Sequence, residues 1–250
     1  MNVVTRSTVA LAAFLIAPVV AAAQATPSAD EVFARYVNAI GGVDAVMHVS
    51  SIKSTGKVDL PGTGISGTFE SFAAPHRIVT KMNIAGVGEI ANGYDGSVAW
   101  EVNPMQGPRI KSEKEKISAQ EEADFYASIL FLKERFQSAE TVGPADFGGE
   151  KTWQIKTVLK SGKVVNEFFS VATGLKVGSQ STSTTDASST NIVTVESEYK
   201  QFGALKRATR SEMTTGARKV VVTLTDVQLG ELPETAFALP EPVKALIKQY

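Results

Sequence analysis

The sequence has 250 residues and no cysteine, and its 25 Lys and Arg residues nearly balance its 26 Asp and Glu residues, leaving a formal net charge of −1. This balance argues against nucleic-acid binding, which depends on clustered positive charge. The lack of cysteine excludes disulfides, thiolate chemistry and lipid attachment to a cysteine, so a chain of this length must rely on its apolar core.

Residues 1–23 have the pattern of a secretory signal peptide. Arg6 is the only charged residue among them, the run STVALAAFLIAPVVA is apolar, and small residues precede Gln24. The apolar run is short for a bilayer span, and no later segment is apolar enough to cross a membrane. We therefore expect export, cleavage near Gln24, and one soluble periplasmic domain over residues 24–250.

A capping box at Ser28-Ala-Asp-Glu31 predicts the start of an amphipathic helix that ends at Gly41-Gly42. A shorter helix is expected around Val43 to Met47. The apolar residues of the first helix recur at helical spacing: Val32, Phe33, Tyr36, Val37 and Ile40.

From Ile52 onward, apolar and polar residues alternate as in antiparallel strands. Tyr94-Asp95-Gly96 predicts a tight hairpin that places Ile90 and Trp100 on neighbouring strands. The low-complexity run at 181–191 is expected to be a long or frayed hairpin connection. Strands are expected at 52–60, 67–72, 76–84, 88–93 and 97–102, and later at 151–159, 163–171, 175–183, 191–199, 204–213 and 219–229.

Between these two groups of strands, Ser118-Ala-Gln-Glu121 indicates a second capping box. The long helix expected after it carries Phe125, Ile129, Leu132 and Phe136 on one face. The alternating charges of KSEKEK, residues 111–116, favour an exposed loop before this helix. Helix, strands, helix and strands in this order predict an α+β single domain.

The motif Gly62-x-Gly64-x-x-Gly67 has the spacing of a dinucleotide-binding loop, which functions only between a strand and a helix N-terminus. The residues after it are β-branched and aromatic and include a proline, so they predict a strand. We therefore expect Pro61 and the three glycines to form a turn and a flexible strand edge between two antiparallel strands, and not a nucleotide site.

Catalytic residues are scarce in this sequence. The only histidines, His48 and His76, are far from any nucleophile motif, and we expect both at the surface or in turns. Two distant histidines without cysteine do not form a usual metal-ligand set. The sequence thus predicts a protein that is not an enzyme and needs no cofactor or metal.

A long sheet that curves either fills its concave side with side chains or leaves a cavity for an apolar ligand. Core packing is the alternative interpretation for every candidate lining residue. The candidates are Phe72, Ile78, Met82, Ile84, Trp100, Met105, Trp153 and Phe169 from the strands and loops, with Phe125, Ile129 and Leu132 from the middle helix.

Segments spread in order over residues 28–240 resemble the outer-membrane lipoprotein-sorting (LolA-like) family of secreted bacterial proteins. The most specific segments are YDGSVAWEVNPMQGPR and DVQLGELPETAF, supported by ARYVNAIGGVDAV, VDLPGTGISGTFE and EFFSVATGLKV. This resemblance implies an unclosed antiparallel β-barrel covered by helices, whose concave apolar face receives acyl chains or another hydrophobic ligand.

These observations predict a periplasmic, non-enzymatic binding protein that holds a lipid or an acylated protein for transport or sorting to the outer membrane. The free energy gained by burying apolar surface, about 0.8 kcal/mol per methylene group, would drive such binding. The alternative is a sensing or accessory module of the cell envelope that binds a partner protein.

Overall fold

The computed structural model describes residues 25–185 and 188–248, so the signal peptide predicted at residues 1–23 lies outside the described residues. The first group of strands is β1 Ile52–Leu60, β2 Ile65–Ala74, β3 Arg77–Ile84, β4 Gly88–Tyr94, β5 Ala99–Asn103 and β6 Gly107–Ile110. The second group is β7 Phe136–Phe147, β8 Glu150–Leu159, β9 Val164–Ser170, β10 Lys176–Thr185, β11 Ser188–Phe202, β12 Leu205–Thr215 and β13 Arg218–Leu229.

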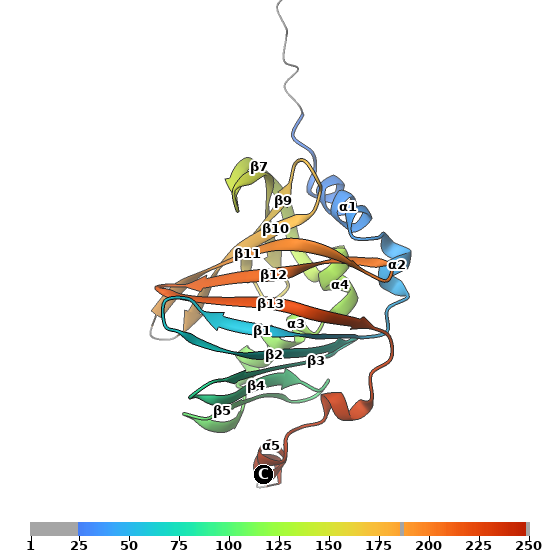
Figure 1. The fold of residues 1–250 in the computed structure, drawn as a ribbon. Coiled ribbons are helices and arrows are strands. Elements are labelled where there is room, and N and C mark those ends of the chain that lie inside the picture. Colours follow the sequence, from blue (N-terminus) through green and yellow to red (C-terminus); the bar gives the residue numbers. More distant parts are fainter. Residues whose placement is uncertain (1–24, 186–187, 249–250) are drawn as a thin grey trace, which may run out of the picture.

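In the described segments these strands form one 13-stranded antiparallel sheet, ordered β6-β5-β4-β3-β2-β1-β13-β12-β11-β10-β9-β8-β7. Each group is a meander, and β1 pairs with β13 to join the two, from Ile52 opposite Leu229 to Asp59 opposite Val221. The sheet curves without closing (Figure 1). The predicted fold, an unclosed antiparallel barrel covered by helices, is confirmed.

The turns between strands follow the sequence prediction in most places. The hairpin at Asp95 joins β4 to β5, and the glycines at 62 and 64 form the turn between β1 and β2, with a strand and no helix after them. The run at 181–191, expected to be a long or frayed connection, is paired as strand over most of its length. Its residues continue the β10–β11 ladder, from Ser181 opposite Ile192 to Thr185 opposite Ser188.

Both predicted N-terminal helices are present, as α1 Ala29–Ala39 and α2 Val43–Met47. The capping box at Ser28 and Glu31 is formed: the Glu31 amide donates to the Ser28 hydroxyl at 3.3 Å, and the Ser28 amide donates to Glu31 Oε2 at 2.7 Å. The buried residues of α1 include Val32, Phe33 and Val37, so its apolar stripe faces the sheet as predicted.

The prediction of a single long helix in the middle of the chain is wrong. There are two short helices, α3 Glu113–Glu122 and α4 Phe125–Leu130, followed by a 3₁₀ turn, η1 Lys133–Arg135. The capping box that starts α3 is Ser112 with Glu115, so the KSEKEK segment expected to be a loop begins this helix, and Ser118 lies inside it.

Aromatic packing explains why the helical pattern stops after α4. Phe131 adopts a left-handed conformation with φ of 52°, which ends α4. Its ring stacks on Phe33 of α1 at 4.7 Å between centroids and meets Phe169 of β9 edge-on at 5.4 Å. Phe136 joins the same cluster as the first residue of β7. These tertiary contacts outweigh the helical spacing of Phe125, Ile129, Leu132 and Phe136.

Helices α1 to α4 cover one face of the sheet, which we call the inner face (Figure 1). One core cluster joins α1 to β8 and β9, a second joins α1, α2 and α4 to β12 and β13, and a third lies between α3 and β4. None of the helices in the described ranges is long and apolar enough to cross a membrane.

The C-terminal segment covers part of the opposite, outer face. It contains the 3₁₀ helix η2 Glu234–Phe237 and the helix α5 Glu241–Ile247. Phe237 and Val243 pack in a cluster with Phe72 and Trp100. Arg77 pairs with a glutamate of η2 and lies over the ring of Phe237 at 4.6 Å, which fixes this segment to β3.

The N-terminus of α3 offers a direct test of the corrected helix start. Ser112→Ala removes the acceptor for the Glu115 amide and should lower the free energy of unfolding by about 1 kcal/mol. Ser118→Ala, at an exposed site inside α3, should change it by less than about 0.5 kcal/mol. Urea denaturation of both variants gives the comparison. A larger loss for Ser118→Ala would contradict the assigned cap.

Candidate functional site

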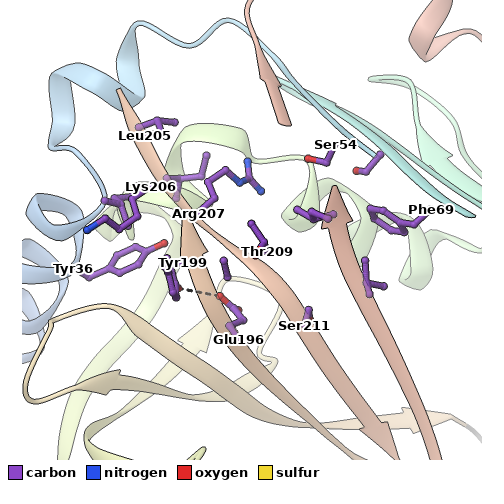
Figure 2. A pocket seen from close by; sticks show the side chains of 16 residues that line it. Tyr36, Ser54, Phe69, Glu196, Tyr199, Leu205, Lys206, Arg207, Thr209 and Ser211 are labelled. Atoms are coloured by element: carbon purple, nitrogen blue, oxygen red, sulfur yellow. Dashed lines mark hydrogen bonds between the residues drawn. The ribbon is translucent and has the colours of Figure 1, made fainter. Parts of the chain in front are cut away.

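The main candidate site is a pocket of about 410 Å³ on the inner face, between the middle of the sheet and helices α1 and α4 (Figure 2). It lies across the seam between β1 and β13, and the two meanders both contribute to its walls. The lining residues are Tyr36, Ile40, Ser54, Phe69, Ser71, Ile129, Glu196, Tyr199, Leu205, Lys206, Arg207, Ala208, Thr209, Ser211, Val222 and Leu224.

One side of this pocket is apolar. Phe69 of β2 and the β13 residues Val222 and Leu224 line the sheet side, and Ile129 of α4 lines the helical side. Ile129 is only partly buried and packs at the margin of the core cluster that contains Phe125. An apolar ligand in the pocket would therefore contact both the sheet and α4.

The other side borders a cluster of charged side chains at β9, β10 and β11. Lys176 Nζ lies 3.1 Å from a carboxylate oxygen of Glu167 and 3.2 Å from one of Glu196. The exposed fractions of these three side chains are 18%, 12% and 23%, so the cluster is largely withdrawn from solvent. One ammonium group thus neutralises part of the charge of two carboxylates.

Burial shapes the protonation of this cluster. Desolvation by itself would lower the pKa of Lys176, but attraction by Glu167 and Glu196 overcomes it and raises the pKa above its ordinary value. Burial, reinforced by the charge of Glu196, raises the pKa of Tyr36 to about 12. The same causes, burial first, raise the pKa of Tyr199. Both phenols stay neutral and Lys176 stays charged at neutral pH.

A local irregularity in β11 places two of these groups on the same face. Glu198 has a left-handed φ of 56°, and the regular β11–β12 pairing is interrupted there, between Ser197 opposite Arg210 and Tyr199 opposite Ala208, without a change of register. Strict alternation would point Glu196 and Tyr199 to opposite faces, whereas both line the pocket.

Hydrogen bonds hold Glu198 and its neighbours in place. The Thr209 hydroxyl, which is almost fully buried, donates to the Glu198 carbonyl at 2.6 Å. The Tyr199 hydroxyl donates to the Lys176 carbonyl at 2.8 Å and lies 3.4 Å from Glu196 Oε2.

Arg207 of β12 occupies the boundary between the apolar and charged sides. It is partly buried, and it lines both the main pocket and a smaller hollow of about 110 Å³ under α4. Ile129 is also shared by these two spaces. Burial lowers the pKa of Arg207, while Tyr36 and Glu196 act in the opposite direction.

Of the residues predicted to line a cavity, Ile129 is the one that the main pocket contains. Phe125 borders the smaller hollow under α4. Trp153 and Phe169 belong to the core under α1, where they border a separate shallow hollow. Leu132 is 39% exposed after α4, and Met105 is 87% exposed in the turn between β5 and β6.

The remaining predicted residues belong to β2–β5. The inner face carries Ile78, Met82 and Ile84, because Met82 pairs with the pocket residue Phe69 and every second residue of β3 points to the same side. These three residues do not line the pocket. Phe72 and Trp100 face the outer side, in the cluster with the C-terminal segment. Core packing thus accounts for both of these aromatic residues.

Sequence reasoning missed the charged residues of the site: Lys176, Glu167, Glu196 and Arg207. One signal was present, because Glu167 has the same strand parity as the aromatic Phe169 and Lys176 pairs directly with Phe169. Charged residues placed on the face of a buried aromatic residue indicate a buried polar cluster.

The two histidines considered for catalysis and metal binding lie at the surface. His48 and His76 are both exposed, as predicted. The His48 ring bonds the Asp44 carbonyl, and the His76 amide donates to the Ala123 carbonyl. Across the described ranges there is no group of three or more His, Cys, Asp or Glu that could hold a metal ion.

Comparison with solved structures supports the fold. A DUF1329 family protein from Desulfovibrio piger superposes with a TM-score of 0.56 at 12% identity, covering 83% of this chain and 96% of the other. A Vibrio parahaemolyticus domain whose name assigns it to outer membrane lipoprotein sorting gives a TM-score of 0.55 at 13% identity, covering 88% and 97%. No protein-family model and no curated protein matches the sequence. The similarity therefore establishes a shared LolA-like fold.

Removing Lys176, the cation that pairs with Glu167 and Glu196, should have a large effect on stability. Lys176→Met leaves Glu167 and Glu196 unpaired and should lower the free energy of unfolding by about 3–5 kcal/mol. Lys156→Met, which breaks an exposed pair with Glu140, should cost less than about 1 kcal/mol. Chemical denaturation at neutral pH measures both.

The pH dependence of the same variant gives a second readout. Although desolvation acts against it, attraction by Glu167 and Glu196 raises the pKa of Lys176, so the stabilisation from this residue is fully present below the ordinary lysine pKa and is lost as the pH rises above it. The stability deficit of Lys176→Met should therefore be full at neutral pH and shrink in alkaline solution. A deficit that is small at neutral pH, or that grows as the pH is raised, would contradict this account of the cluster.

Proposed function

We propose that this protein is a non-enzymatic binding protein of the bacterial cell envelope that holds a hydrophobic ligand, an acyl chain of a lipid or acylated protein, on the inner face of its sheet. The observation that supports this most is the pocket between the sheet and α4, which has apolar walls from both. Its volume of about 410 Å³ is in the lower part of the range of about 300–1,000 Å³ typical of small-molecule sites.

The pocket size favours a single acyl chain over a lipid with two chains. Phe69, Val222, Leu224 and Ile129 offer apolar contact along such a chain, and burial of its methylenes supplies the binding energy. The shared fold with a domain named for lipoprotein sorting is consistent with a ligand of this kind. Transport or sorting to the outer membrane is the role we propose for this binding.

The periplasmic location belongs to the same proposal and rests on residues 1–23. We expect the full-length chain to be exported and shortened, with the mature protein starting near Gln24, and a chain without residues 1–23 to stay in the cytoplasm. Cell fractionation and N-terminal sequencing test this. A mature N-terminus that retains Met1 would overturn the expectation of a cleaved signal.

Ile129 provides the central test of ligand binding. Ile129→Glu places an unpaired carboxylate against the apolar side of the pocket, so affinity for a fluorescent fatty acid should fall at least about tenfold. Because Ile129 is only partly buried and the pocket is open to water, the melting temperature should change little.

Two neighbouring positions are the controls. Leu132→Glu, at an exposed site outside the pocket, should preserve both binding and stability. Leu130→Glu, at a buried core site, should lower the melting temperature strongly. If Ile129→Glu binds the fatty acid as well as the parent, the pocket is not the acyl-chain site. If the parent itself binds no fatty acid and purifies without lipid, the alternative of a partner-binding module gains support.

A further inference from the structure

The guanidinium group of Arg207 is the one feature of the pocket that acyl-chain binding alone does not use. Figure 2 shows it reaching into the pocket toward the side where Ser54 lies, while the ammonium group of the adjacent Lys206 points the other way. Within the described part of the chain, the guanidinium group of Arg207 forms no hydrogen bond and no ion pair, although its backbone belongs to the β11–β12 ladder. Lys176, the cation of the neighbouring charged cluster, is held by two carboxylates.

A guanidinium without partners in a partly buried site is unfavourable, because burial removes water from a group that keeps its charge. The lowered pKa of Arg207 reflects this desolvation. The group has several N–H donors in a fixed planar arrangement that matches a carboxylate or a phosphate. Arg207 is thus suited to an oxyanion that enters the pocket.

The carboxylate of Glu196 is already engaged elsewhere. Glu196 attracts Arg207, yet its carboxylate lies 3.2 Å from Lys176 Nζ and 3.4 Å from the Tyr199 hydroxyl. Glu196 belongs to β11, where it pairs with Ser211 while Arg207 pairs with Lys200, and it does not form an ion pair with Arg207. An incoming oxyanion would therefore compete with the long-range attraction of Glu196 and not with a formed salt bridge.

We propose that Arg207 binds the anionic head of the ligand, a carboxylate or phosphate attached to a single acyl or alkyl chain, while the apolar side of the pocket holds the chain. This inference rests on the proposed function and specifies its ligand class. The ligand is an ionised amphiphile whose head is fixed at β12 and whose chain extends between the sheet and α4.

The test compares ligands with the same chain and different heads. The purified protein should bind palmitate and hexadecyl phosphate more tightly than hexadecanol by about tenfold to hundredfold, the range for a hydrogen bond to a charged group. Isothermal titration calorimetry measures all three. Higher affinity for hexadecyl phosphate than for palmitate would identify a phosphate head group, and higher affinity for palmitate would identify a carboxylate. Either order supports an oxyanion site.

Variants at Arg207 and at a matched position assign the effect to this side chain. Arg207→Met should bring palmitate affinity down to that of hexadecanol and leave hexadecanol binding within about threefold, and Arg207→Lys should retain part of the preference. Arg210→Met is the control: Arg210 is on the same strand outside the pocket and pairs with Glu212. It should keep the preference of the parent.

Removing the competing carboxylate of Glu196 should increase the affinity for an anionic ligand. Glu196→Gln should raise palmitate affinity without raising hexadecanol affinity, because an opposing negative charge is lost while Glu167 remains to pair with Lys176. Equal binding of palmitate and hexadecanol by the parent protein would overturn the head-group site but leave acyl-chain binding intact. Binding of none of the three ligands would overturn the proposed function itself.

Discussion

The pairing of β1 with β13 is the contact on which the rest of the structure depends, because it makes one sheet from two meanders. The pocket lies across this seam, with Ser54 on β1 and Val222 and Leu224 on β13, so it exists only when the seam has formed. The pairing changes register next to Gly56, where a Cβ atom would lie 2.2 Å from the Thr223 carbonyl oxygen. Only glycine permits this close approach of the two strands.

Much of the fold follows from local sequence patterns. Alternation located most of the strands, including β1 with its bounds at Ile52 and Leu60, because a strand with one buried face repeats every two residues. The middle helices were misjudged for a physical reason. Two candidate capping boxes follow each other closely in this region, at residues 112–115 and 118–121. Phe131 and Phe136 are held by contacts with Phe33 and Phe169 that no local pattern reveals.

The candidate site was much harder to predict than the fold. Aromatic and Met residues were reasonable choices for a lining, yet Phe72 and Trp100 pack under the C-terminal segment, which covers the outer face. The polar groups of the site depend on the left-handed backbone at Glu198, beyond which Tyr199 lines the same pocket as Glu196. A non-glycine residue with positive φ breaks the alternation of the strand locally, and the alternating pattern of the sequence cannot locate it.

The short helix α4 connects the site to the dynamics of the fold. It has six residues and is bounded by the non-helical Asp124 and the left-handed Phe131, so it is too short to be stable without its contacts to the core. Those contacts come from Phe125 and Leu130, whereas Ile129 separates the main pocket from the hollow under the helix. Ile129 and Arg207 line both spaces, so the position of α4 determines how much apolar surface is available to a chain whose head is held at Arg207.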